Sequence, residues 1–203
     1  MATSGVTMQR SELHELHYIT PIVNAPSIVA RGILSHRAAE KLQHESVAMA
    51  EIQTLRSAKG VPGARQLHEY VNLYITARNP MMYKLQARHA QLCVLRVSPN
   101  VLDTPDAIVS SGYSASEYTR FAPAPEGLAI VDGQRVFAQY WTSSDPIEGF
   151  RRKSAKCAEV LVPNRIDPSS IIGAYVSCEE AREALESVCS TVPVTLLPSL
   201  FFR

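Results

Sequence analysis

The chain has 203 residues, of which 46% are hydrophobic and 19% charged, and its formal net charge is +1. This is the composition of an ordinary globular protein, and we expect a single domain spanning residues 1–203. The near-neutral charge excludes a global attraction to polyanions, so a nucleic-acid partner would have to be held by a local patch.

The spacing of cysteines and histidines predicts neither disulfides nor a metal site. The four cysteines form no CxxC pair, and the six histidines are scattered through the first half of the chain without ligand spacing. We therefore expect reduced thiols and no metal. The sequence has no run of about 18 apolar residues and no secretion signal, so we expect no membrane association and a cytoplasmic location.

The first half of the chain predicts two strands around a helix and a long polar segment. An Asn cap, an early Pro and a closing Gly predict the helix, and aromatic alternation predicts the second strand. In chain order, the elements are a strand over 15–20 ended by Pro21, a helix over 24–34 that stops at Gly32, a helical or irregular segment over 35–51 that could cover a pocket, a helical stretch over 52–57, a turn at 60–63, and a strand over 70–76 broken at 78–80.

The second half is richer in strands. We assign no firm structure to most of 111–139, apart from a short helix near 114–119, and the basic run 151–153 has a plain interpretation as a solvated loop. The elements are strands over 91–97, 107–110, 158–162, 171–176, 192–197 and 199–202, with a helix over 179–188. Strands outnumber helices and are unevenly interspersed, which favours an α+β fold over a doubly wound α/β fold.

One carboxylate, Glu159, interrupts the apolar strand 158–162. A carboxylate on a half-buried strand is costly unless it is hydrogen-bonded, paired or held at the edge of a cleft. It could point to solvent and pair with Lys156 or Arg165, or it could lie in a cleft, where such acids do chemistry.

Four segments, taken in order, resemble the DarT family of bacterial toxins, which transfer ADP-ribose from NAD to a nucleobase in single-stranded DNA. The resemblance spans about Leu16 to Phe202, and its most specific part is the aromatic strand that runs into Asn-Pro-Met-Met-Tyr. The segments are His17-Tyr18-Ile19-Thr20 with Asn24 and Gly32-Ile33-Leu34; Ile52-Gln53 with Arg56; Tyr70 to Ile75 with Arg78 to Tyr83; and Ala158 to Val162. The family usually carries a polar residue where this chain has Pro21.

The resemblance implies two small, mainly antiparallel sheets with an NAD cleft between them and helices around. It makes Glu159 and Arg56 the catalytic residues, although Arg56 could instead be a solvated helix residue paired with Glu51 or Glu69. Strand alternation lets only one of His17 and Tyr18 enter the cleft, and we prefer His17. The implied NAD-binding residues are His17, Thr20, Asn24, Gly32, Leu34, Arg56 and Tyr74.

Basic residues beside aromatic ones suit a single nucleic-acid strand, because phosphates are neutralised while bases stack. The residues that we expect to contact single-stranded DNA are Arg78, Met82, Tyr83, Arg151, Arg152, Lys153 and Lys156. The base, thymine or guanine, stays open. The family resemblance also implies an antitoxin that inhibits the enzyme or removes the adduct, and we expect a monomer. Two alternatives remain: an ADP-ribosyltransferase acting on RNA, protein or a small molecule, and a catalytically inactive nucleotide-binding module.

Overall fold

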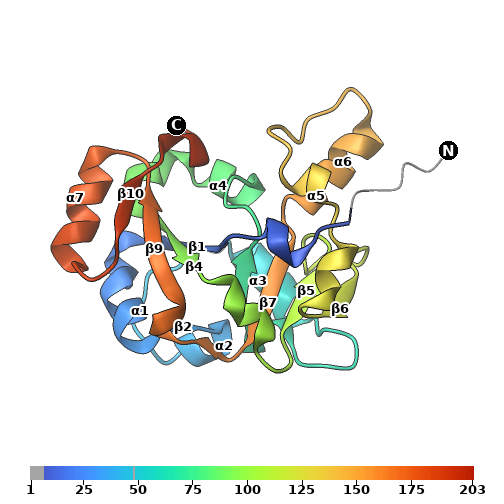
Figure 1. Cartoon of the computed structure of the whole chain (residues 1–203), viewed down its shortest axis with the longest axis horizontal. Coiled ribbons are helices and arrows are strands. Elements are labelled where there is room, and N and C mark those ends of the chain that lie inside the picture. The colour runs from blue at the N-terminus through green and yellow to red at the C-terminus, as the bar shows by residue number, and fades with distance from the viewer. Residues whose placement is uncertain (1–6, 48) are drawn as a thin grey trace.

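A sheet of mostly antiparallel strands runs through the centre of the molecule, with helices at its sides and upper end (Figure 1). The computed structural model describes residues 7–47 and 49–203. The strands are β1 (Leu16–Pro21), β2 (Ile33–Leu34), β3 (Tyr70–Tyr74), β4 (Leu92–Val97), β5 (Ile108–Ser110), β6 (Phe121–Pro123), β7 (Glu159–Pro163), β8 (Arg165–Ile166), β9 (Ile171–Val176) and β10 (Val194–Leu196). The helices are α1 (Ala25–Arg31), α2 (His36–Ala39), α3 (Ala50–Ser57), α4 (Pro80–Lys84), α5 (Gly133–Val136), α6 (Pro146–Ala155) and α7 (Glu179–Val188).

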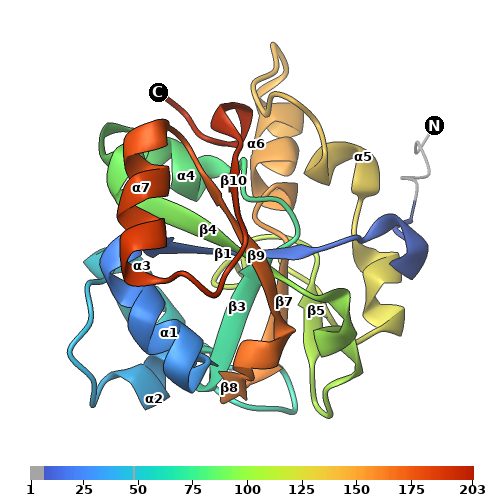
Figure 2. The ribbon, with the colours of Figure 1, turned by 60° about the vertical axis from the view of Figure 1, so that its left-hand side comes forward.

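The large sheet consists of two halves that meet at one residue pair. Its strand order, within the described residues, is β10-β9-β4-β1-β3-β7-β5-β6, and a second sheet pairs β2 with β8. β1 pairs with β4 over six residues, but it meets β3 only at His17 and Tyr74. Beyond that point β1 and β3 diverge (Figure 2). The expected α+β class is confirmed, and the gap between the two halves lies where the resemblance implied a cleft.

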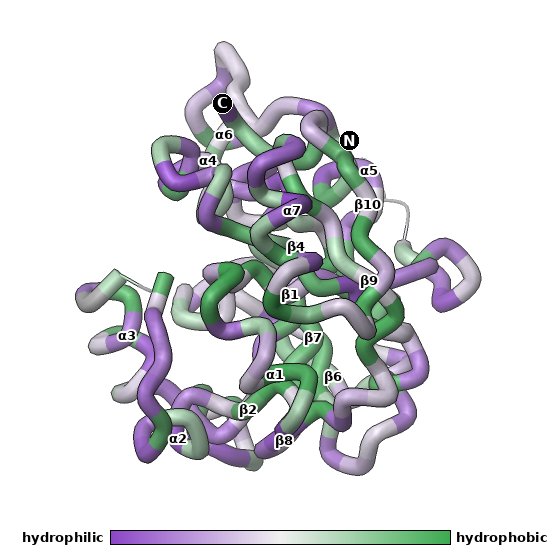
Figure 3. The backbone as a smooth tube through the Cα atoms, turned by 90° about the vertical axis from the view of Figure 1, so that its left-hand side faces the viewer, coloured by the Kyte–Doolittle hydropathy of each residue, from purple (hydrophilic) through white to green (hydrophobic). Residues whose placement is uncertain are grey.

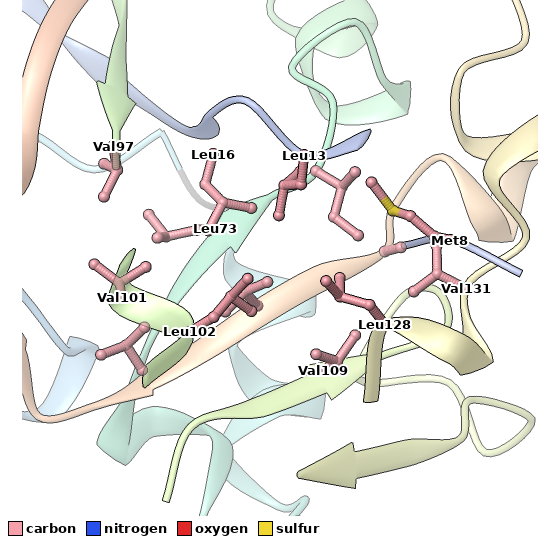
Figure 4. Close-up of a cluster of buried hydrophobic side chains, with 14 of the residues drawn as sticks. Met8, Leu13, Leu16, Leu73, Val97, Val101, Leu102, Val109, Leu128 and Val131 are labelled. Carbon is pink, nitrogen blue, oxygen red and sulfur yellow. The ribbon is translucent and has the colours of Figure 1, made fainter. Parts of the chain in front are cut away.

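Buried side chains of the strands pack into apolar clusters that fill the centre of each half of the sheet. Side chains from β1, β3, β4, β5 and the turns beside them form the largest cluster, part of which is labelled in Figure 4. Another cluster packs α7 against β4 and β9. The backbone of the central strands is largely hydrophobic, whereas the outer segments around α2 and α3 are largely hydrophilic (Figure 3). Burial of strand residues therefore fixes the frame of the site.

Local sequence signals explain the helices that flank the site. Asn79 caps α4 by accepting a hydrogen bond from Met82 N at 3.0 Å, and Pro80 follows as the first helical residue. Asp145 caps α6 in the same way, accepting from Ile147 N at 2.9 Å ahead of Pro146. The basic run 151–153 thus belongs to helix α6 and is not a loop. The expectation of a loop rested on the charge of the run alone and overlooked the helix start at Asp145 and Pro146.

Other predicted elements are also corrected by the structure. Residues 198–200 form a 3₁₀ turn where we expected the strand 199–202, since Pro198 cannot donate to a ladder. The segment 114–119 consists of turns and bends instead of a short helix. In the described part of the chain, no helix combines the length and the apolar character needed to cross a membrane.

Candidate active site

A cavity of about 640 Å³ opens between β1 and β3. This volume lies within the range of about 300–1,000 Å³ that is typical of ligand pockets. Its walls are Tyr18–Pro21 of β1, residues of β3, helix α3, residues 44–47 and 49, and the loop 113–117. The segment 35–51, which we expected to cover a pocket, does contribute a wall.

Arg56 and Glu159 form a buried ion pair beside this cavity. Glu159 begins β7 and is 0% exposed, whereas Arg56 lies near the end of α3 and is 5% exposed. Arg56 Nη1 lies 3.3 Å from Glu159 Oε2 and 3.5 Å from Oε1. Burial disfavours the charge of Arg56, but the carboxylate of Glu159 outweighs it and raises the pKa of Arg56 above its usual value. Arg56 therefore does not pair with Glu51 or Glu69. Glu159 likewise does not pair with Lys156 or Arg165, the partners that the sequence suggested.

Two serines hold Glu159 from the other side. Ser114, 0% exposed, donates its hydroxyl to Glu159 Oε2, and Ser110 accepts a hydrogen bond from Glu159 N at 3.1 Å. Ser110 pairs with Glu159 across β5 and β7, and its own hydroxyl donates to Gly112 O at 2.9 Å. The carboxylate of Glu159 is thus oriented by Arg56 and by the loop that follows β5.

Two tyrosines complete the surroundings of the pair. Tyr74 is opposite Glu159 in the β3–β7 register, and its hydroxyl donates to Met81 Sδ at 3.1 Å. Burial, and next the negative charge of Glu159, raise the pKa of Tyr74 well above its usual value, so its hydroxyl stays protonated. The hydroxyl of Tyr113 is buried and has no hydrogen-bond partner within the described residues. A buried hydroxyl is costly to leave unpaired, so a hydrogen bond between Tyr113 and a molecule in the cavity would be favourable.

Four of the NAD-binding residues expected from the resemblance border the cavity together with Arg56: Thr20, Asn24, Leu34 and Tyr74. Asn24 is also tied to the wall segment. Its side chain donates to Glu45 O at 2.7 Å and accepts from Glu45 N at 3.0 Å. An ion pair between Arg88 and Glu45 adds to this attachment. Asn24 therefore holds the wall in position.

The described cavity-lining residues include Tyr18 and not His17, so the preference for His17 stays an untested prediction, and the geometry favours Tyr18. His17 is held instead by Glu15, whose Oε1 lies 3.1 Å from His17 Nε2. Burial opposes ionisation of Glu15, but hydrogen bonds from His17, Arg96 and Tyr175 outweigh it and lower the pKa of Glu15 to about 2. His17 belongs to this charged cluster.

Gly32 likewise does not border the cavity within the described chain. Its φ is +88°, and a Cβ at this position would lie 2.1 Å from Ile166 O of β8. Only glycine allows the backbone of β2 to approach β8 so closely. Gly32 therefore has a structural role at this contact, and its expected role in NAD binding stays a prediction.

Three residues that we expected to contact DNA are occupied by the fold. Arg78 donates to the carbonyls of Ser199 and Phe201 at 2.8 Å and stacks over Phe202. Met82 is fully buried. Lys156 is 2% exposed and donates to Val136 O at 2.9 Å and Ala138 O at 2.6 Å. Sequence reasoning missed this because these residues resemble surface residues until their backbone partners are known.

The other expected contact residues are exposed or half-exposed near the cavity. Arg151 and Lys153 are exposed on α6, and Arg152 is half-exposed and bonded to Glu148 at 3.0 Å. Lys153 and Phe150 also border the cavity. Tyr83 is 47% exposed and meets Trp141 and Phe202 in edge-to-face contacts. Helix α6 therefore brings one basic and one aromatic side chain, Lys153 and Phe150, to the cavity.

The loop 113–117 holds a site residue that sequence reasoning missed, Ser114, in the segment that we expected to be a short helix. We had expected Tyr113 only as an aromatic residue of the nucleic-acid surface. A signal was present, because the run Ser-Ser-Gly-Tyr-Ser-Ala-Ser directly follows a strand. The loop is fixed in place by Lys59, which donates to Ser116 O, and by Gly112, where a Cβ would lie 2.6 Å from Ser154 Oγ.

The chain is similar to one known protein family and to several of its members over most of its length. A family model described as "ssDNA thymidine ADP-ribosyltransferase, DarT" matches residues 17–202. The chain is 33% identical over 196 residues to a "DNA ADP-ribosyl transferase-DNA ADP-ribosyl glycohydrolase fusion protein" of Thermosipho africanus, covering 93% of this chain and 49% of that protein. It is 28% identical over 200 residues to a "DNA ADP-ribosyl transferase" of Thermus sp., covering 93% of both. The chain thus spans about half the length of the Thermosipho relative.

Solved structures have the same fold. Thermosipho africanus DarTG in complex with ADP-ribose superposes with a TM-score of 0.81 at 30% identity, covering 93% of this chain and 51% of that one. Thermus sp. DarT in complex with ADP-ribosylated ssDNA superposes with a TM-score of 0.82 at 23% identity, covering 94% and 97%. The frame of two half-sheets is therefore shared with both structures.

Proposed function

The chain belongs to the DarT family, whose model matches most of its length, and we propose that it transfers ADP-ribose from NAD to the base of thymidines in single-stranded DNA. The observation that carries this proposal is the Arg56–Glu159 pair, buried beside a cavity large enough for a ligand. A charged pair is expensive to bury, and such groups cluster at functional sites.

The cavity walls are suited to NAD as the donor substrate. Most of the lining is apolar, and a few polar groups converge on it. The unpartnered hydroxyl of Tyr113 offers one bond to a ligand. We propose that Thr20, Leu34 and Tyr74 contact NAD and that Tyr18 takes the place we had given to His17. Asn24 acts by holding the wall segment around Glu45.

Glu159 would act on the sugar that is transferred. When the bond between nicotinamide and the ribose carbon breaks, positive charge develops on the ribose ring, as in glycoside hydrolysis. An ionised carboxylate stabilises that charge and can hold a ribose hydroxyl. A ring nitrogen of the base then forms the new bond to the same carbon, nicotinamide leaves, and the proton of that nitrogen passes to Glu159 or to water.

Arg56 has two proposed roles. Its guanidinium orients Glu159 and compensates its negative charge through the contacts at 3.3 and 3.5 Å. It also supplies a permanent positive charge beside the cavity, which suits a pyrophosphate or the polarised oxygen of a base. Both roles depend on the burial of Arg56, because electrostatic interactions are stronger away from water.

The DNA strand would approach across α6. Arg151, Lys153 and the half-exposed Arg152 provide charge for phosphates, while Phe150 and Tyr83 offer faces on which bases can stack. A single strand is the appropriate substrate, since a base must leave the stack to reach a ribose carbon inside a cavity. Arg78, Met82 and Lys156 are not included, because their side chains are already occupied or buried.

Modification of DNA bases would make the protein a toxin that needs a counterpart. The Thermosipho relative is a fusion of a transferase with a DNA ADP-ribosyl glycohydrolase. We propose that this chain likewise acts with an antitoxin that removes or prevents the adduct. Its DNA target would place the activity in the cytoplasm, and we propose that it acts as a single domain and a monomer.

The experiment that tests the proposal is incubation of the full chain with NAD and each of four single-stranded homopolymers, followed by mass spectrometry. The thymidine homopolymer should gain one ADP-ribose unit per modified base. A mixed oligonucleotide without thymidine serves as the control. Exclusive modification of guanine, RNA or protein would refute the assignment of thymidine DNA as the acceptor.

A further inference from the structure

Two histidines and a glutamate meet at the cavity wall, away from the Arg56–Glu159 pair. His36 and Glu40 lie one turn apart on α2, and His68 comes from the 3₁₀ turn Leu67–Glu69 ahead of β3. One ligand atom of each residue lies within 4.8 Å of those of the other two. The rings of His36 and His68 are 4.1 Å apart, and His36 Nε2 lies 3.8 Å from Glu40 Oε1.

His36 and Glu40 are spaced so that both side chains can bind the same ion. Ligands at i and i+4 on a helix project from one face, as in helical zinc motifs. Ser35 fixes the start of this short helix by accepting a hydrogen bond from Ala38 N at 3.3 Å, and Glu40 keeps helical backbone angles at its end. Both side chains therefore start from defined positions.

His68 has the features of a metal-binding histidine. Its Nε2 is buried and has no hydrogen-bond partner within the described residues. The ring also bonds the backbone of Gln53. The unpaired Nε2 is therefore open to a metal.

Two imidazoles and a carboxylate are a donor set that suits zinc and its close analogues, and three protein ligands leave a fourth position open.

We propose that His36, Glu40 and His68 bind one Zn²⁺-class ion, whose fourth position faces the cavity. His36 and His68 both border the cavity, so this position is reached by water or by an oxygen of a bound molecule. None of its ligands belongs to the Arg56–Glu159 pair, and its test measures metal binding directly, so the result does not depend on whether the proposed transfer occurs.

The plain alternative is that the three residues are only neighbours. Stacked histidine rings and an i,i+4 pair occur on ordinary helices, and Glu40 has 59% of its side chain exposed. The two explanations differ in how they account for Nε2 of His68. A bound ion would pair with this nitrogen, whereas a cluster of mere neighbours leaves it unpaired at a cost in free energy. Metal binding by the intact protein separates them.

The test is titration of the full, tag-free chain with Zn²⁺ by calorimetry and with Co²⁺ by visible absorption. We expect one equivalent to bind, with the Co²⁺ spectrum of a four-coordinate site. His36→Ala and Glu40→Gln, both at partly exposed positions, should each weaken binding at least 10-fold. His44→Ala is the matched control, because His44 borders the same cavity outside the cluster.

Two results would overturn the proposal. One is the absence of binding at micromolar metal. The other is binding that survives both His36→Ala and Glu40→Gln, since the ion would then be held elsewhere, for example by a cysteine. His68→Asn is a further variant, and its fold is checked by circular dichroism before titration. An unchanged affinity in a folded His68→Asn protein would also contradict the assigned site.

Discussion

Arg56 Nη1 lies 3.3 Å from Glu159 Oε2, although 103 positions separate the two residues in the chain. Both side chains are almost completely buried, so each charge depends on the other for compensation. The contact joins α3, which contributes a wall of the cavity, to the first residue of β7. Two energetic consequences follow, one for folding and one for catalysis.

Removing only one member of this pair should destabilise the fold. Arg56→Met leaves the carboxylate buried without its partner, and we expect the free energy of unfolding to fall by about 3–5 kcal/mol. The double variant Arg56→Met with Glu159→Leu removes both charges and should recover to within about 2 kcal/mol of the natural protein, since apolar pairs often replace buried ion pairs at little cost. Urea unfolding measures both. Equal losses in the single and double variants would contradict the coupling.

Ser114 should act as a positioning residue for Glu159. Ser114→Ala removes a hydrogen bond to a charged group, so we expect kcat to fall about 10-fold or more with little change in the KM for NAD. Ser114→Thr keeps the hydroxyl and should restore part of the rate. Ser187→Ala, on α7 and outside the cavity lining, is the control, because its exposed hydroxyl bonds the carbonyl of Ala184 in the same helix. A purely structural role would lower stability in Ser114→Ala and leave kcat per folded molecule unchanged.

Glu15 should stabilise the fold at neutral pH and should lose this contribution in acid. Its pKa is about 2 in the folded protein and near 4.5 when unperturbed, so between these values the unfolded chain takes up a proton that the folded chain does not. Stability supplied by Glu15 is therefore present above about pH 4.5 and is lost as the pH falls toward 2. We expect about 1–2 kcal/mol, allowing for partial exposure.

The measurement for Glu15 is urea unfolding of the natural protein and of Glu15→Gln between pH 6 and pH 2.5. The difference in stability between the two should shrink as the pH falls through this window. Glu45→Gln, whose carboxylate pairs with Arg88 on a more exposed surface, is the control. A difference that stays constant with pH would rule out the shifted pKa of Glu15.

Gly32→Ala should damage the fold and not NAD binding. The added Cβ would meet Ile166 O at 2.1 Å in a left-handed backbone conformation, so we expect a loss of about 2 kcal/mol or more. Gly63 also has a positive φ, but a Cβ there would meet nothing within 4 Å, so Gly63→Ala should cost only about 1 kcal/mol. Thermal unfolding compares the two. Equal shifts in Tm, or a folded Gly32→Ala protein with a raised KM for NAD, would restore the cofactor role.

The sequence predicted most of the strands, because period-two alternation and Pro or Gly boundaries are local signals. It predicted the place of Glu159 on a strand, but not its partner, because Arg56 meets it only through tertiary packing. The helix 146–155 was missed although Asp145 and Pro146 announce its start. Lys156 resembled a surface cation, and only the fold reveals that the carbonyls of Val136 and Ala138 occupy it. The convergence of His36 and His68 was hidden for the same reason, since 32 positions separate them.

The most direct test of the central claim is the transfer of ADP-ribose by Glu159→Gln. This variant keeps the shape of the side chain and its ability to accept a bond from Arg56 or Ser114, but it removes the negative charge. With NAD and a thymidine-containing single strand, mass spectrometry should show a rate at least about 10²-fold lower than that of the natural protein, with circular dichroism unchanged. Transfer within about threefold of the natural rate would contradict the role of this carboxylate.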